Sequence, residues 1–141
     1  MTKLQMAMFP PKSEWVPPVE LPDLTKATVI GIDCETRDPN LKKNGPGWPT
    51  GDGEVVGYSL AVDGWSGYLP LKHFGGGNLD EKIVNRWLKK VFECPADKVM
   101  HNAAYDLGWI KQEGFTVNGR VIDTMMIASL LDENRFSYSL N

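Results

Sequence analysis

The segment from Thr28 to Thr36 constrains the fold more than any other part of the sequence. It begins as an apolar, β-branched run that is typical of a buried strand. Asp33 and Glu35 then follow two residues apart, and residues i and i+2 of a strand point to the same face of a sheet. Two adjacent carboxylates repel each other, and a divalent cation bound by oxygen ligands compensates them. The segment therefore predicts a metal site at the end of a buried strand or, on the plainer interpretation, a strand that runs into a polar turn.

Composition limits the classes of protein to which the chain can belong. Its 141 residues suit a single domain, and a hydrophobic content of 42% is enough for an ordinary core. The net charge of −3 does not indicate a protein that grips nucleic acid by charge alone, but an enzyme can meet phosphates through bound cations. The two cysteines form no C-x-x-C pair, which argues against a zinc site. We expect no membrane span and no signal peptide, and hence a soluble protein in a reducing cytoplasm.

The first half of the chain contains an extension, a strand and a long loop. Residues 1–24 hold five of the ten prolines and are expected to be an extended N-terminal segment ahead of a domain over residues 25–141. The first strand is expected over residues 27–35. Residues 37–53 are rich in Gly, Pro and Asn and predict a loop that could flank a substrate cleft. Trp48 in this loop is either an exposed aromatic residue or folds back on the core.

Three further segments continue the expected sheet and its helical cover. Residues 54–62 and 65–71 alternate as strands around Asp63-Gly64, a strong hairpin signal. An amphipathic helix is expected to follow with Asn78 as its N-cap and Cys94-Pro95 at its end. We predict that this helix is structural.

The last third of the chain predicts a second strand–helix unit. A short strand over residues 98–100 leads into a helix over residues 103–113, and a further β segment is expected around residues 116–117. Asp123 or Thr124 then caps a last helix. The order predicts an α/β domain with a mixed sheet, in which the first three strands are antiparallel and a later strand is parallel to the first, flanked by helices.

A third carboxylate belongs with the first two if the predicted strands are neighbours. Asp106 lies in the first turns of the second helix, whose N-terminus offsets part of the clustered negative charge. Hard oxygen ligands without His or Cys suit magnesium or manganese. Two such ions about 4 Å apart can activate a water molecule and stabilise the leaving oxygen in phosphodiester hydrolysis.

These residues resemble the motifs of a known family. The segment Ile32-Asp33-Cys34-Glu35-Thr36 resembles the first motif of the DEDD 3′–5′ exonucleases, and His101-Asn102-Ala103-Ala104-Tyr105-Asp106 resembles the second, N-x-x-x-D. Residues 56–61, 68–71 and 121–125 are also similar. The resemblance covers residues 25–141 and is greatest to the proofreading exonuclease domain of family A DNA polymerases, including those of phages.

The resemblance implies a ribonuclease H-like fold and two-metal hydrolysis at a DNA 3′ end. By position, Asp33, Glu35 and Asp106 would be catalytic metal ligands for two Mg²⁺ or Mn²⁺ ions, with Asp33 shared between them. Thr36 would lie near the terminal nucleotide, and Asn102 would contact the substrate or brace the cleft. The implied partners are a single-stranded or frayed DNA 3′ end and a polymerase domain in the same or another chain, in a bacterial or phage-infected cell.

Other residues near these motifs have two possible roles each. For Asp123, N-capping is a simpler role than catalysis. His101 is expected to pack the end of its strand rather than to act as a general base. Tyr105 and Trp109, one helical turn apart, could stack on bases or pack in the core.

The sequence departs from the family pattern at its C-terminal end. The family has a third motif, Y-x-x-x-D or H-x-x-x-D, whereas Tyr138 is not followed by an Asp four residues later. We therefore expect a domain that is incomplete at the C-terminus, either a fragment or a naturally shortened protein. Three of four carboxylates predict weak metal binding and reduced activity. A non-catalytic module that binds DNA or a polymerase, and an RNA-trimming enzyme, remain the alternatives.

Overall fold

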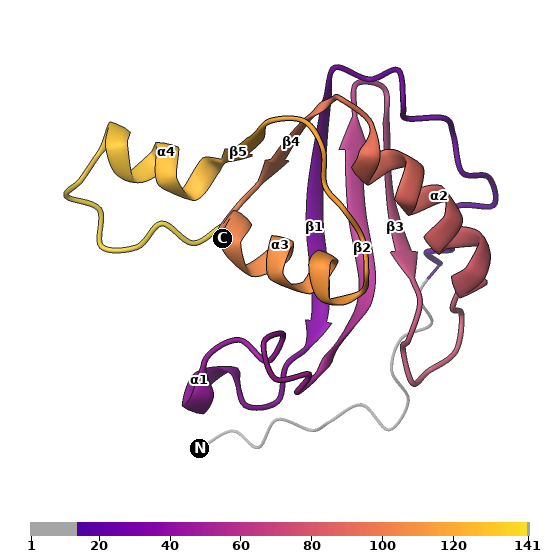
Figure 1. Cartoon of the computed structure of the whole chain (residues 1–141), viewed down its shortest axis with the longest axis horizontal. Coiled ribbons are helices and arrows are strands. Elements are labelled where there is room, and N and C mark those ends of the chain that lie inside the picture. The colour runs from indigo at the N-terminus through magenta and orange to yellow at the C-terminus, as the bar shows by residue number, and fades with distance from the viewer. Residues whose placement is uncertain (1–13, 141) are drawn as a thin grey trace.

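A computed structural model describes residues 14–140, so the expected N-terminal extension lies partly outside the described residues (Figure 1). Within this range the elements follow in the order β1 (Val29–Arg37), α1 (Leu41–Asn44), β2 (Glu54–Val62), β3 (Trp65–Pro70), α2 (Glu81–Glu93), β4 (Asp97–Met100), α3 (Ala103–Gln112), β5 (Val121–Asp123) and α4 (Thr124–Leu131).

The strands form one mixed sheet with the order β3-β2-β1-β4-β5. β1 pairs antiparallel with β2, and β2 pairs antiparallel with β3 through the predicted turn at Asp63-Gly64. β4 pairs parallel with β1, and β5 pairs parallel with β4. The predicted mixed sheet, with three antiparallel strands and a later parallel one, is therefore confirmed.

β1 begins and ends later than the sequence predicted. It runs from Val29 to Arg37 rather than over residues 27–35. Its last two residues stay in the sheet because they pair with Val55 and Glu54 of β2, beyond an irregularity in register after Glu35. The loop that follows is also more ordered than predicted, since α1 forms one helical turn inside it.

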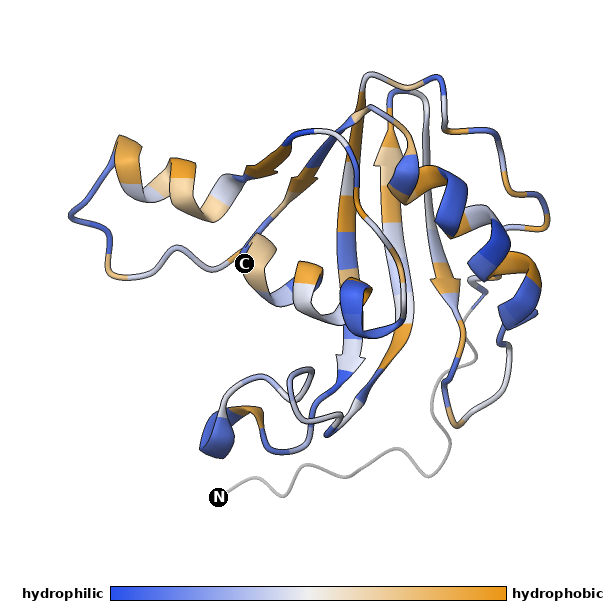
Figure 2. Ribbon diagram, in the orientation of Figure 1, coloured by the Kyte–Doolittle hydropathy of each residue, from blue (hydrophilic) through white to orange (hydrophobic). Residues whose placement is uncertain are grey.

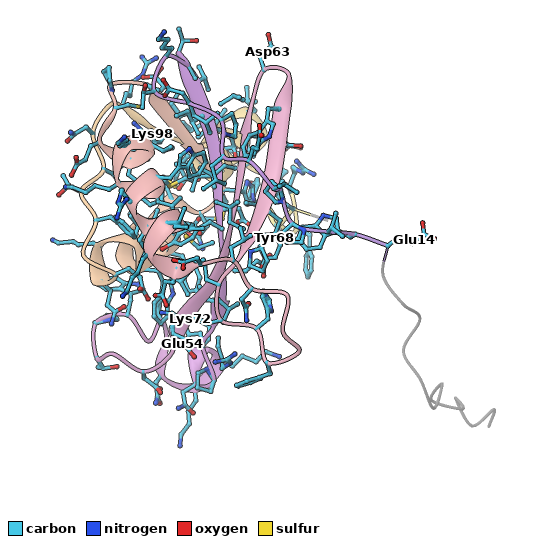
Figure 3. All side chains as sticks on the ribbon, turned by 90° about the vertical axis from the view of Figure 1, so that its right-hand side faces the viewer. Glu14, Glu54, Asp63, Tyr68, Lys72 and Lys98 are labelled. Carbon is cyan, nitrogen blue, oxygen red and sulfur yellow. The ribbon has the colours of Figure 1, made fainter. Side chains whose placement is uncertain are left out.

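Helices α2 and α3 cover one face of the sheet, as Figures 1 and 3 show from two directions. Figure 2 shows α2 alternating between hydrophobic and hydrophilic residues along its length. Its buried side chains are Val84, Leu88, Val91 and Phe92. They pack in one core cluster with strand residues such as Ile30 and Tyr58. α2 is thus the structural helix that the apolar spacing predicted.

The predicted N-cap of α2 is wrong. Asp80 caps the helix, and its Oδ1 accepts a hydrogen bond from the Ile83 amide at 3.1 Å. The side chain of Asn78 instead bonds the main chain of His73 in both directions, at 2.8 and 2.9 Å, and closes the glycine turn between them. Both residue types are good caps, so the sequence could not decide which of the two capped the helix.

The predicted β segment at residues 116–117 is also displaced. No strand is assigned there, and the short strand β5 forms at Val121–Asp123. Phe115 and Val117 pack against the core, and the Asn118 amide donates to the Phe92 carbonyl at 2.9 Å. These contacts tie the segment to the end of α2, so it connects α3 to β5 without joining the sheet.

The two ends of the described chain contact the domain differently. Leu24 is buried in the core, and the Trp87 indole donates to the Pro22 carbonyl at 2.7 Å. α4 extends away from the edge of the sheet (Figure 1), and none of its residues is buried. Its N-cap is Asp123, one of the two residues predicted for this role. In residues 14–140 no helix has the length and apolar character to cross a membrane.

A buried lysine holds together the segments behind β4. Lys98 is 0% exposed, and its ammonium donates to the carbonyls of Cys94, Ala96 and Asn118 at 2.5, 2.9 and 2.7 Å. The three N–H donors of an ammonium are thereby matched by three acceptors. Lys98 thus joins the end of α2 to the segment that precedes β5.

We expect Lys98→Met to lower the free energy of unfolding by about 3 kcal/mol or more, because three buried carbonyls would lose their donor. Urea denaturation of both proteins measures this change. Lys89→Met is the matched control, since Lys89 is exposed and forms an ion pair with Glu93 on the same helix. Its effect should stay below about 0.5 kcal/mol. Equal effects of the two substitutions would contradict the structural role of Lys98.

Candidate active site

The candidate site begins where β1 continues past the end of β4. β1 is paired with β2 as far as Arg37, but its pairing with β4 ends at Gly31. The amide of Cys34 therefore has no β4 partner. Asp106 takes that place, and its Oδ1 accepts a hydrogen bond from the Cys34 N–H at 3.0 Å. A buried amide needs an acceptor, so this bond fixes the carboxylate of α3 against β1.

Asp106 is a buried acid whose environment opposes its charge. Only 3% of its surface is exposed. Burial is the main cause that raises the pKa of Asp106, the Cys34 amide lowers it and the charge of Asp33 raises it, and the net pKa is about 6. Burial also raises the pKa of Asp33, whereas His101 lowers it. Two carboxylates thus interact at the junction of β1 and α3, and a cation bound between them would relieve both effects.

Glu35 lies on the same face of the sheet as Asp33, and both residues are solvent-exposed. It pairs across the sheet with Gly57 of β2. A Cβ atom on Gly57 would lie 2.2 Å from the Tyr68 hydroxyl, so the missing side chain lets Tyr68 reach over β2. Burial and, after it, the charge of Glu35 raise the pKa of Tyr68. Glu35 is therefore electrostatically coupled to Tyr68 of β3.

The predicted ligand set is only partly assembled. Among residues 14–140, no group of three or more His, Cys, Asp or Glu side chains is arranged to hold a metal ion. The donor types fit Mg²⁺ or Mn²⁺, because all three predicted ligands are carboxylates and the Cys34 amide holds one of them, Asp106, against β1. The set Asp33, Glu35 and Asp106 stays a prediction.

Thr36 and Asn102, the two predicted substrate-binding residues, both contact Tyr105. The Thr36 hydroxyl shares a 2.8 Å hydrogen bond with the Tyr105 hydroxyl, which donates to Asp38 Oδ2 at 3.0 Å. Asn102 is exposed and has a left-handed backbone with φ of 68°. Asn tolerates this conformation better than most residues. Its side chain thus remains exposed at the start of α3.

Asp123 has the capping role that the sequence favoured, and it caps two helices. Its carboxylate accepts from the amides of Asn102 and Ala103 at the start of α3, at 3.0 and 2.9 Å, and from Met125 in α4 at 2.9 Å. Burial raises the pKa of Asp123, but these backbone donors outweigh it and the net pKa is lowered. Asp123 thereby sets the position of the helix that carries Asp106.

His101 packs the end of β4, as expected. Its Nδ1 contacts the Thr124 hydroxyl at 2.9 Å, and its Nε2 lies 2.5 Å from the Tyr138 carbonyl oxygen, to which it donates. Tyr138 thus meets His101 through its backbone, while its own hydroxyl donates to the Asp132 carbonyl. The C-terminal segment of the described chain is attached to the site by this contact.

A cavity of about 710 Å³ lies on the face of the sheet that bears Asp33. Ser59, Tyr68, His101 and Thr124 are among its other lining residues. Figure 3 places Tyr68 on the opposite side of the sheet from α2 and α3. The cavity gives Asp33 access to solvent and to a ligand.

Sequence reasoning missed Tyr68 and Asp38 as parts of the site. Gly57 was the signal for Tyr68, because a glycine inside a strand often marks a close approach of another group. The sequence holds no such signal for Asp38. One of its hydrogen-bond partners, Tyr105, is far away in the sequence, and the other, the Gly47 amide, lies in a loop with no regular pattern.

A family model described as 3′–5′ exonuclease matches residues 68–141, more than half of the chain. The chain belongs to this 3′–5′ exonuclease family. A DNA-directed DNA polymerase of Pseudomonas phage M6 is 39% identical over 150 residues, covering 99% of this chain and 22% of the polymerase. The chain thus spans about a fifth of the length of that relative.

Solved structures confirm the ribonuclease H-like fold of this exonuclease domain. Brucella melitensis NrnC with bound Mg²⁺ superposes with a TM-score of 0.60 at 17% identity, over 85% of this chain and 54% of NrnC. The POL domain of Pol1 from M. smegmatis, in complex with DNA primer-template and dNTP, gives a TM-score of 0.57 at 16% identity, over 82% of this chain and 18% of Pol1. At these identities the comparison supports the fold alone.

The raised pKa of Asp106 predicts how stability depends on pH. Its folded pKa of about 6 exceeds the value of about 3.9 in an unfolded chain, so the folded state binds the proton more tightly. The free energy of unfolding in EDTA should therefore fall as pH rises from about 4 to 6. We expect a loss on the order of 2 kcal/mol relative to Asp106→Asn, which does not titrate.

Urea denaturation of both proteins between pH 4 and 7.5 measures this difference. Asn keeps an oxygen that can accept from the Cys34 amide, so the variant changes the charge more than the geometry. Stability curves that run parallel across this range would show that Asp106 has an ordinary pKa.

Proposed function

We propose that this exonuclease domain removes nucleotides from the 3′ end of DNA by two-metal hydrolysis, with Asp33, Glu35 and Asp106 as its metal ligands. The observation that carries the proposal is the Asp33–Asp106 pair, in which Asp106 is anchored to the Cys34 amide at the end of β1. The 39% identity to a phage DNA polymerase supports DNA as the substrate and a polymerase as the partner.

The chain's own residues would position the metal ions and the DNA. Bound divalent cations would supply a hydroxide-like nucleophile and offset the charge that develops on the phosphate. The Cys34 amide orients Asp106, and the double cap at Asp123 fixes the start of its helix. Thr36 and Tyr105 provide hydroxyls beside the carboxylates, and the exposed Asn102 amide is free to contact the strand.

The net charge of −3 is compatible with this function, because cations rather than lysines would meet the phosphate that is cut. The polymerase domain would lie in the same or another chain, and the protein would act in the cytoplasm of a bacterial or phage-infected cell. The preferred substrate would be a frayed or single-stranded DNA 3′ end, and DNA would be cut faster than RNA.

One observation favours a second candidate, a module that keeps the fold and binds DNA or a polymerase without cutting. No complete three-ligand group is formed among residues 14–140. With an incomplete group of ligands, metal binding would be weak and cleavage slow. Both candidates share the fold and DNA, and differ in whether the phosphodiester bond is broken.

A nuclease assay with Asp33→Asn tests the proposal. The chain is incubated with 5′-labelled single-stranded DNA and Mn²⁺, and products shortened from the 3′ end are resolved by length. Asp33→Asn should reduce their rate at least about a hundredfold, the scale of losing a group that stabilises charge in the transition state. An RNA strand of the same sequence should be cut more slowly.

Asp63→Asn is the matched control for this assay. It makes the same chemical change at the tip of the β2–β3 hairpin, at the opposite end of the sheet from Glu54 (Figure 3), and Asn-Gly is an equally good hairpin turn. Its activity should equal that of the unaltered chain. A folded chain that binds DNA but leaves it intact would support the non-cutting module, and cleavage that survives Asp33→Asn would disprove the assignment.

A further inference from the structure

The side chain of Glu35 is not held in place as that of Asp106 is. Asp106 accepts a hydrogen bond from the Cys34 amide, whereas the Glu35 carboxylate forms no hydrogen bond or ion pair with any residue between 14 and 140. Glu35 is also exposed on β1. A long exposed side chain loses conformational entropy when it binds a cation, and a neighbouring donor that restricts the side chain beforehand reduces this loss.

A hydroxyl from β3 lies close to Glu35. Tyr68 (Figure 3) pairs with Ser59, which pairs with Asp33, so Tyr68 is on the face of the sheet that bears both acids. Its hydroxyl lies 2.2 Å from the position that a Cβ atom on Gly57 would occupy. Gly57 is the cross-strand partner of Glu35, and the Cβ atoms of such partners are about 4.5–5.5 Å apart. The Tyr68 hydroxyl thus takes the place of the side chain that Gly57 lacks, at a distance that a glutamate side chain can bridge.

His73 fixes the position of that hydroxyl. Its Nε2 lies 2.5 Å from the Tyr68 oxygen, and the two rings meet edge to face with their centroids 5.8 Å apart. His73 is held in turn by Asn78, whose side chain accepts from the His73 amide at 2.8 Å and donates to its carbonyl at 2.9 Å. The Trp15 ring also packs on Tyr68, at 5.8 Å between centroids. The hydroxyl is thereby positioned without a ligand.

The contact between Tyr68 and His73 leaves a hydrogen-bond donor for Glu35. A neutral tyrosine hydroxyl has one proton to donate and lone pairs that accept at the same time. With His73 donating from Nε2, the proton of the Tyr68 hydroxyl is left to donate to another group. An ionised glutamate only accepts hydrogen bonds, so Glu35 supplies the acceptor that this donor lacks.

We propose that Tyr68 and His73 form a positioning pair for Glu35, in which Tyr68 donates a hydrogen bond to the Glu35 carboxylate and directs it at a divalent cation. The inference rests on the proposed function, in which Glu35 is a metal ligand. Both residues of the pair act through Glu35 and are themselves neither ligands nor catalytic residues. Side chains that orient a metal ligand in this way contribute roughly 10–100-fold to metal affinity.

Metal binding in the absence of DNA tests the pair without relying on cleavage. Mn²⁺ is titrated into the chain, and the electron paramagnetic resonance signal of free Mn²⁺ gives the dissociation constant. Tyr68→Phe removes the hydroxyl but keeps the ring, and should weaken binding about tenfold or more. Tyr58→Phe is the matched control, because the Tyr58 hydroxyl is buried and has no hydrogen-bond partner in the described part of the chain. Its Mn²⁺ affinity should equal that of the unaltered chain.

A double-mutant cycle with Glu35→Ala separates positioning from a general effect on the fold. If Tyr68 acts through Glu35, adding Tyr68→Phe to the Glu35→Ala chain should not weaken Mn²⁺ binding further. If Tyr68 only supports the sheet, the effects of the two substitutions on the dissociation constant should multiply, because independent sites have additive free energies. Multiplied effects would therefore overturn the proposal.

His73 has a separate readout in rescue by a conservative variant. His73→Ala leaves the Tyr68 hydroxyl without its partner and should weaken Mn²⁺ binding toward the level of Tyr68→Phe. His73→Gln places a side-chain amide near the former Nε2, where it can still bond the hydroxyl, and should recover most of the affinity. Equal Mn²⁺ affinities of the Ala and Gln variants would remove His73 from the pair.

The outcomes keep this inference and the proposed function apart. If cleavage depends on Asp33 but Tyr68→Phe binds Mn²⁺ as the unaltered chain does, the positioning pair is wrong and the exonuclease proposal stands. If Mn²⁺ binding depends on both Glu35 and Tyr68 but no DNA is cut, the pair stands without the chemistry. A folded chain that binds no Mn²⁺, or binds it equally well after Glu35→Ala, overturns the pair.

Discussion

The hydrogen bond between the Cys34 amide and Asp106 is the constraint on which the site depends. It exists because the pairing of β1 with its parallel neighbour β4 ends at Gly31, so that the Cys34 amide has no partner on β4. An acid delivered by the following helix satisfies one of them at the cost of being buried beside Asp33. The same mismatch therefore leaves an amide that needs an acceptor and brings together two carboxylates whose charges a bound cation would stabilise.

The position of Asp106 depends on the position of α3, and Asp123 fixes the start of this helix. The Asp123 carboxylate accepts hydrogen bonds from three amides at the starts of α3 and α4, which have no partner inside their helices. The end of β5 therefore fixes the starts of both helices. Lys98 of β4 has a similar role, because its ammonium donates hydrogen bonds to three carbonyls, two after the end of α2 and one in the segment that precedes β5. Short strands such as β4 and β5 contribute few ladder bonds, and these side chains supply the connections that the strands are too short to make.

The sequence predicted most of the sheet, because apolar alternation and the Asp63-Gly64 turn are local signals. It failed where two local signals were equivalent, as with Asn78 and Asp80, or where a tertiary contact decided, as with Phe115 and Val117 packing in place of a strand. For the site, Asp33 and Asp106 could be predicted from motif spacing. Asp38 could not, since its role arises from a contact with Tyr105 that only the folded chain creates.

The distribution of charge explains how an acidic domain could hold a polyanion. The predicted ligand carboxylates lie around the junction of β1 and α3, where bound cations would reverse the sign of their charge. Under the proposed function, cations bound by these carboxylates rather than the net charge of the chain would govern how the domain meets DNA.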